Sequence, residues 1–310
     1  MDIAHAMVKA VVQGLTEFLP VSSTAHLTLA DALFAQWGSG NPPLPGENEF
    51  YDILLHLGTL SAVLIYFRRD LIDIVLMCLG KKTERGSHSQ LGVLQEKVLP
   101  IQLIVSMVVT VVVILTLLKG SGFLMSSLGW SEVPKDNLSE FFFRHPRFVG
   151  FHLLITGCLL WGVEMLLKKR QKASGALFEM KHAAWVGFAQ GYAAIFHGIS
   201  RSGSTMATAL VLNVDRLTAA RYSFLLSIPT FLMAAVYECL KLHDLRVLPL
   251  LNWPLMLSGT VVSAIVGYYC VKQFIQFVAS HSLKPFAVYC WVMGMAIIFY
   301  FSMFGYVAAG

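Results

Sequence analysis

Six long apolar stretches constrain this chain more than any other feature. Each is close to the roughly 20 residues that a helix needs to cross about 30 Å of hydrocarbon. They occur at residues 50–67, 98–118, 148–167, 221–240, 254–273 and 286–308. We therefore expect an all-α, polytopic integral membrane protein with six full transmembrane helices, built as a single membrane domain over residues 1–310.

The composition agrees with that class. Hydrophobic residues make up 56% of the chain and charged residues only 13%, whereas an ordinary soluble domain has about 25% charge. So few charges cannot cover a water-facing surface, which excludes a soluble enzyme, a disordered chain and a nucleic-acid binder. The five cysteines have no C-x-x-C spacing, so we expect small apolar side chains rather than disulfides or a zinc site.

Two further apolar regions, 3–36 and 183–213, are interrupted near their middles. Gly, Ser, His and a charged residue fall together in each, and the first also contains Pro20. A backbone break at membrane depth is tolerated only where protein or a water-filled cavity surrounds it. We therefore predict two helix–break–helix pairs, re-entrant rather than spanning, in addition to the six spans.

The basic residues predict an orientation. Lys and Arg concentrate at 68–97 and 168–181, whereas 36–50 has none, and basic loops lie on the cytoplasmic side of a membrane. The segment 36–50 and a loop at 119–147 are then external. The first interrupted region opens to the outside, the side on which we expect the functional site, and the second opens to the cytoplasm.

The chain also contains a weak internal repeat. The aligned pieces are Gln13-Gly14 with Gln190-Gly191 and residues 51–59 with residues 222–230. Three predicted spans, an odd number, separate the two copies, so the copies face opposite ways. We expect an inverted-topology repeat with halves at about 1–118 and 148–310. In such repeats the ligand site lies near the midplane, where half-helix N-termini face an anion.

The two breaks are followed by residues typical of anion-binding helix starts. After Pro20, Ser22 or Ser23 is expected to cap a helix, and Ser23 and His26 share a face of it. Glu17 lies on the other side of that break. The second break leads into hydroxyls, backbone N–H groups and a guanidinium. These residues are Ser200, Arg201, Ser202, Gly203, Ser204 and Thr205.

Such groups would suit a phosphate. A helix N-terminus supplies unpaired N–H groups and about half a positive charge, and Arg binds phosphate with two parallel hydrogen bonds. If the two breaks meet, a phosphate or diphosphate is the expected ligand. A charge at membrane depth costs about 2.5–3.5 kcal/mol or more, so we expect functional roles for Glu17 and Arg201.

Several residues have structural alternatives. Small residues are common where membrane helices pack closely, which is an alternative for Ser22, Ser202 and Ser204 and the expected role of Gly187 and Gly191. His56 and His197 either line a cavity or are hydrogen-bonded structural residues. Tyr51 and Tyr222 are expected as interfacial anchors. Glu164 and Glu238 are expected to pair with Lys168 and Lys241 near span ends.

At this point the motifs are recognisable. Residues 13–26, QGLTEFLPVSSTAH, together with residues 198–205, GISRSGST, closely resemble the undecaprenyl-diphosphate phosphatase family, the bacitracin-resistance proteins. The resemblance covers nearly the whole chain. It implies a bacterial inner-membrane hydrolase that removes one phosphate from a C55 polyprenyl diphosphate. This reaction recycles the lipid carrier for peptidoglycan synthesis and confers bacitracin resistance.

The resemblance also implies site residues. The family's acidic motif falls on Gln13 and Glu17, its Ser and His on Ser23 and His26, and its Arg motif on 197–205. The implied diphosphate contacts are Gln13, Ser22, Thr24, Ser200, Ser202, Gly203 and Thr205. Position 13 is Gln where many members have Glu, and position 197 is His where the family has Pro. We expect His197 to change the helix entry rather than to donate a proton.

These observations lead to one hypothesis with open alternatives. Arg201 stabilises charge on the terminal phosphate, and Ser23 is the preferred nucleophile with His26 as base and Glu17 as the orienting group. His26 itself could attack, and Glu17 could hold a divalent cation such as Mg²⁺ or Ca²⁺. No organic cofactor is expected. A transporter that flips a prenyl-phosphate lipid is the alternative function, and the sequence leaves the oligomeric state open, a homodimer included.

Overall fold

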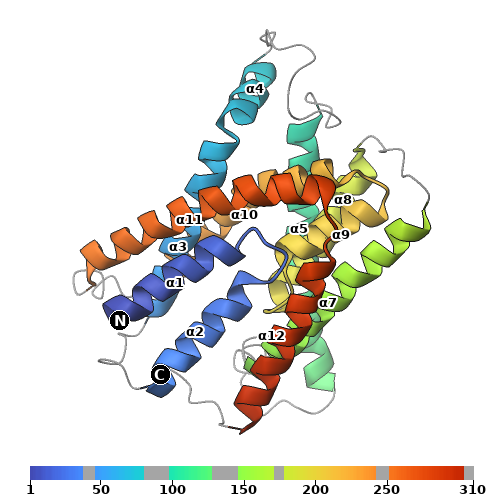
Figure 1. Ribbon diagram of the computed structural model, residues 1–310. Helices are drawn as coiled ribbons and strands as arrows, with labels where there is room; N and C mark the ends of the chain where they lie inside the picture. The colour runs from blue at the N-terminus through green and yellow to red at the C-terminus, as the bar shows by residue number, and fades with distance from the viewer. Residues whose placement is uncertain (38–45, 80–97, 128–145, 171–177, 242–250, 304–310) are drawn as a thin grey trace.

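The described residues of this computed structural model are 1–37, 46–79, 98–127, 146–170, 178–241 and 251–303, and within them all regular structure is α-helical (Figure 1). Eleven helices lie in these ranges. They are α1 (Ile3–Thr16), α2 (Ser23–Trp37), α3 (Glu47–Tyr66), α4 (Arg68–Cys78), α5 (Leu99–Ser127), α7 (Pro146–Lys169), α8 (Met180–Ile195), α9 (Arg201–Val211), α10 (Arg216–Lys241), α11 (Trp253–Ser280) and α12 (Lys284–Met303).

Six helices among the described residues are long and apolar enough to cross a membrane, as predicted. They are α3, α5, α7, α10, α11 and α12. Their outer faces are apolar, as in Val108 and Val112 of α5 and Val292 and Phe299 of α12, all exposed. The fold is therefore that of a polytopic membrane protein. Residues 119–127, expected in an external loop, instead continue α5, because the apolar pattern runs past Lys119; residues 128–145 lie outside the described part.

Both interrupted regions form helix–break–helix pairs, as predicted. The first break, residues 17–22, joins α1 to α2, and the second, residues 196–200, joins α8 to α9. Ser22 has a φ of 64° and Gly198 a φ of 101°. A Cβ at Gly198 would lie 2.4 Å from the carbonyl oxygen of Val149, so only glycine fits this turn.

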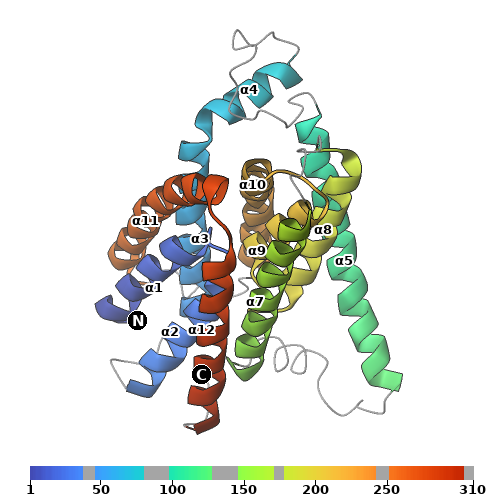
Figure 2. The same cartoon turned by 45° about the vertical axis from the view of Figure 1, so that its right-hand side comes forward.

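The first helix of each pair lies against a long span (Figure 2). Helix α1 packs on α11, where a Cβ at Gly14 would lie 2.7 Å from Cβ of Val266. Helix α8 packs on α5, where a Cβ at Gly187 would lie 2.4 Å from the carbonyl oxygen of Ser106. Gly191 meets Val113 of α5 in the same way. The expected packing role of Gly187 and Gly191 is confirmed.

Two tyrosines differ from expectation. Tyr51 and Tyr222 are fully buried and so are not interfacial anchors. The Tyr51 hydroxyl donates to the carbonyl oxygen of Ala6 at 2.9 Å, and the Tyr222 hydroxyl to that of Gln102 at 2.9 Å. Carbonyl partners inside the bundle satisfy both hydroxyls, which removes the cost of burying them.

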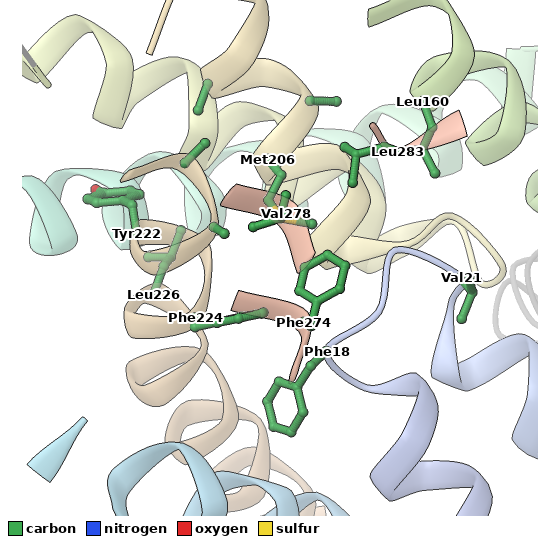
Figure 3. Close-up of a cluster of buried hydrophobic side chains, with 14 of the residues drawn as sticks. Phe18, Val21, Leu160, Met206, Tyr222, Phe224, Leu226, Phe274, Val278 and Leu283 are labelled. Carbon is green, nitrogen blue, oxygen red and sulfur yellow. The ribbon is translucent and has the colours of Figure 1, made fainter. Parts of the chain in front are cut away.

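The first break is held by the apolar core. Phe18 is fully buried and meets Phe224 of α10 edge to face, with ring centroids 5.6 Å apart (Figure 3). Phe274 of α11 lies in the same cluster.

A charge contact links α7, α10 and the start of the α12 segment. Glu164 of α7 accepts from both Nη atoms of Arg216, at 2.6 and 2.7 Å, and from the backbone N–H of Leu283.

The prediction that Glu164 pairs with Lys168 is therefore wrong, because Glu164 pairs with Arg216. A pairing four residues along the same helix is one of several that Glu164 could make, and Arg216 offers a bidentate geometry that Lys cannot. The side chains of Glu238 and Lys241 lie outside the described part, so their expected pairing stays a prediction.

Candidate active site

The two breaks meet at a buried ion pair. Arg201, the first residue of α9, donates from Nη2 to Oε1 of Glu17 at 2.8 Å. Their side chains are 14% and 4% exposed. A second link joins the same segments, because the Ser202 hydroxyl donates to the carbonyl oxygen of Leu19 at 3.0 Å. The structure thus brings together the two charges that the sequence singled out.

Glu17 also connects to the hydroxyl of Ser23. Its Oε2 atom accepts from Ser23 Oγ at 2.7 Å and from Gln13 Nε2 at 2.9 Å. Nε2 of His56 lies 3.6 Å from the same oxygen. One carboxylate therefore aligns Arg201, Gln13 and Ser23, with a histidine at its edge.

The start of α2 explains how Ser23 is presented. Ser22 precedes the helix and its hydroxyl accepts a hydrogen bond of 3.4 Å from the N–H of Ala25. Ser22 is thus the cap, which leaves the hydroxyl of Ser23 for Glu17. The left-handed backbone of Ser22 is unfavourable for a residue with a Cβ, and such residues persist where the surrounding structure holds them, often at functional sites.

The start of α9 is capped by Ser200, whose hydroxyl accepts from the N–H of Gly203 at 3.1 Å. The N–H of Ser200 donates to Thr156 of α7. The hydroxyl of Thr205, expected to contact the diphosphate, is hydrogen-bonded within the protein. It donates to the carbonyl oxygen of Arg201 at 2.9 Å and lies 2.6 Å from Ser223 Oγ. The first turn of α9 is therefore a fixed helix N-terminus with Arg201 at its tip.

A cavity of about 540 Å³ reaches this junction. The expected site residues that line it are Glu17, Ser22, Ser23, Thr24, His56, His197, Ser200, Arg201 and Ser202. Gln13, His26, Gly203 and Thr205 are not among the lining residues. Within Arg201, Nη1 is buried and has no hydrogen-bond partner, so a donor remains available next to the cavity for an anionic ligand.

His26 is not among the residues that line the cavity, and its ring contacts α12. Its Nδ1 donates to the carbonyl oxygen of Ser22 at 2.8 Å, and its Nε2 lies 2.7 Å from the hydroxyl of Tyr289 on α12. The two rings also stack, with centroids 5.7 Å apart. Both ring nitrogens are thus engaged, and neither of these hydrogen bonds is made to Ser23.

The remaining expected histidines face the cavity. Nδ1 of His56 donates to the carbonyl oxygen of Asp52 at 2.7 Å, which directs Nε2 toward Glu17. His197 lies at the second break, and its carbonyl accepts from His152 Nδ1 at 2.7 Å.

Two features of the site were not predicted from the sequence. The first is Phe231 of α10, whose ring centroid lies 4.8 Å from Cζ of Arg201 and 5.5 Å from the centroid of His56. A phenylalanine in an apolar stretch of a membrane helix carries no signal of such a role. Only the fold places its ring beneath the guanidinium.

The second feature is a buried charge cluster beside the cavity. Lys9 of α1 is fully buried and lies 2.9 Å from Asp31 of α2 and 2.8 Å from Asp52 of α3. Nε2 of His5 lies 2.8 Å from Asp31. Asp31 and Asp52 also line the cavity. The signal was available, because Lys9 is a single charge in an apolar segment.

Few ligand atoms near Glu17 are free to coordinate a divalent ion. Its two oxygens already accept from Arg201, Ser23 and Gln13. The described residues contain no group of three or more His, Cys, Asp or Glu side chains able to hold a metal. Oε1 of Gln13 is buried without a partner, but it is only one neutral ligand atom. This set of ligand atoms does not fit a chelated ion.

Comparison with known proteins places the chain in a family. The chain is 34% identical to an undecaprenyl-diphosphatase of Alcanivorax borkumensis, over 97% of this chain and 99% of that one. It is 36% identical to an undecaprenyl-diphosphatase of Desulfosudis oleivorans, over 95% and 97% of the two chains. A family model described as bacitracin resistance protein BacA matches residues 6–296. With almost its whole length matched, the chain belongs to the bacitracin resistance protein BacA family.

Proposed function

We propose that this protein is an undecaprenyl-diphosphate phosphatase. It hydrolyses undecaprenyl diphosphate to undecaprenyl phosphate and inorganic phosphate in the bacterial inner membrane, which recycles the carrier for peptidoglycan synthesis and confers bacitracin resistance. The observation that carries the proposal is the chain of contacts from Arg201 through Glu17 to Ser23 at the cavity. The printed names of the relatives support the same substrate.

The terminal phosphate binds where α2 and α9 begin. Nη1 of Arg201 has no partner within the protein, and the N-termini of both helices add partial positive charge. The hydroxyls of Ser22, Thr24 and Ser202 line the same space. These donors stabilise the charge that develops on the phosphoryl oxygens during transfer.

Ser23 attacks and Glu17 receives its proton. The Ser23 Oγ–phosphorus bond forms as the bridging oxygen–phosphorus bond breaks, and undecaprenyl phosphate leaves. The 2.7 Å hydrogen bond supports Glu17 rather than His26 as the proton acceptor, because a general base must lie within hydrogen-bond reach. Glu17 releases that proton to solvent and then takes one from the water that attacks phosphorus. The Ser23 Oγ–phosphorus bond breaks, inorganic phosphate leaves, and Glu17 returns the proton to Ser23 Oγ.

His26 acts as a positioning residue in this scheme. Its contacts with Ser22 and Tyr289 fix the first turn of α2 against α12, and that turn holds Ser23.

The wider arrangement follows from the same proposal. The two broken pairs form the core of an inverted-topology repeat, with the first pair re-entrant from the outside and the second from the cytoplasm. The equivalent packing of α1 on α11 and of α8 on α5 supports it. The cavity opens to the periplasmic side, because its lining includes Asn48 and Glu49 of α3, which belong to the segment 36–50 that lacks Lys and Arg.

Phosphate release from undecaprenyl diphosphate by the purified protein in detergent tests the function. The wild type should release phosphate, and Ser23→Ala and Arg201→Ala should each lose roughly 10³-fold or more in kcat. A transporter needs no hydroxyl next to a carboxylate. Wild-type release no greater than that of Arg201→Ala would therefore overturn the phosphatase in favour of a lipid transporter.

A further inference from the structure

The cavity has two chemically different walls. Asp31 of α2 and Glu49 and Asp52 of α3 make one side acidic. Another part of the lining is apolar and comes from the C-terminal part of α8 and the second half of α10. Its residues are Ala193, Ala194, Phe231, Ala234 and Ala235. An anionic lipid cannot place its chain along the carboxylates without desolvating them, so the apolar wall is the side that suits a hydrocarbon.

The cavity is too small for the whole of such a lipid. A volume of about 540 Å³ falls in the range of pockets that enclose one drug-sized molecule. A polyprenyl diphosphate with eleven isoprene units is larger than that. Most of the chain must therefore leave the cavity through one of its walls.

The apolar wall reaches the outer surface of the bundle. Ala194 and Ala234 line the cavity and are also exposed. Within one turn of Ala234 on α10, Met233, Val236 and Tyr237 are exposed large apolar side chains. Apolar residues thus extend along α10 from Phe231, beside Arg201, to the exposed side chains of Val236 and Tyr237.

One buried polar group lies beside this wall. Gln190, one turn before Ala194 on α8, is fully buried and lines the cavity. Its Nε2 donates to Thr110 Oγ1 at 3.1 Å, while its Oε1 is buried with no partner. Buried acceptors are rarely left unsatisfied, so this part of the wall presents an acceptor for a ligand or its bound water.

We propose that the polyprenyl chain leaves the cavity between α8 and α10 over Ala194 and Ala234, and that the small size of these two residues is what admits a long chain. The inference rests on the proposed phosphatase function. Short prenyl chains end inside the cavity and need no passage, whereas long chains must thread it. The two alanines therefore determine chain-length selectivity without contacting the diphosphate.

The test compares two substrates in Ala194→Phe and Ala234→Phe. The value of kcat/KM for undecaprenyl diphosphate should fall about tenfold or more, because a bulky side chain would occupy space that the long chain must fill. The value for farnesyl diphosphate should change less than about threefold. Ala234→Val, a milder change, should give a smaller loss in the same direction. Val292→Phe, at a lipid-facing position on α12, is the matched control and should alter neither substrate.

The outcomes separate the two proposals. Equal losses for both substrates, in variants that elute like the wild type on size exclusion, overturn the passage, and so does an unchanged kcat/KM for undecaprenyl diphosphate. A wild type that releases no phosphate from either substrate overturns the phosphatase itself.

Discussion

Arg201 and Glu17 are 184 positions apart in the chain, yet a 2.8 Å ion pair joins them inside the protein. The pair leaves each partner with capacity for chemistry. Glu17 keeps its second oxygen for Ser23, and Arg201 keeps an unpartnered Nη1. The contact thus links the anion-binding start of one helix to the hydroxyl at the start of another.

Glu17→Gln tests the base. The amide keeps the size of the side chain but cannot accept the proton of Ser23, so kcat should fall by roughly 10²–10⁴ with little change in KM. Gln13→Ala is the matched control, because it removes another hydrogen bond to the same oxygen and leaves the carboxylate. Its loss should be about tenfold. Steady-state phosphate release measures both, and equal effects of the two changes would contradict the assignment.

Tyr289→Phe tests whether His26 acts through position. The change removes only the hydroxyl that lies 2.7 Å from His26 Nε2. A positioning role predicts a loss of about three- to tenfold in kcat for this variant, and a similar partial loss for His26→Gln.

Direct chemistry by His26 would give a different pattern. His26→Ala would abolish turnover, Tyr289→Phe would leave it intact, and Ser23→Ala would remain near wild type. That set of rates would transfer the nucleophile from Ser23 to His26.

Local patterns in the sequence predicted the helices and breaks, and distant contacts explain what was missed. Apolar length sufficed for the six spans, and the hydroxyls after Pro20 and Ile199 indicated the helix starts. Tyr289 lies 263 positions from His26, and no local pattern links the two. Phe231 is likewise ordinary in sequence, because its role depends on where Arg201 comes to lie.

A charged residue in an apolar segment was a reliable sign of a functional or paired residue. The rarity of buried charge singled out Glu17 and Arg201, and the same argument applies to Lys9. Lys9 stands near the chain start, yet it is fully buried. The position of a residue near a terminus is weak evidence that it is exposed. The free-energy cost of burying an unpaired charge is stronger evidence that the charge has a partner.

Lys9→Met tests that buried cluster. It leaves Asp31 and Asp52 without their cation, and breaking a buried pair costs about 3–5 kcal/mol, so thermal unfolding in detergent should shift strongly downward. The control is Lys181→Met, since Lys181 pairs with Glu179 at the surface, where such pairs contribute about 0–1 kcal/mol. Adding Asp31→Asn and Asp52→Asn to Lys9→Met should restore stability, and failure of that rescue would contradict a charge-pairing role.

Phe231→Leu tests the support of the guanidinium. The ring face lies 4.8 Å from Cζ of Arg201, and a desolvated cation–π contact contributes about 2 kcal/mol. Removing the ring should lower kcat/KM for the diphosphate by up to roughly 30-fold. Phe231→Tyr keeps the π face and should retain most activity. Phe188→Leu, at an exposed position on α8, should have no effect. If Phe231→Tyr lost as much as Phe231→Leu, the ring would be acting as cavity wall alone, and Arg201 would be held by Glu17 without its help.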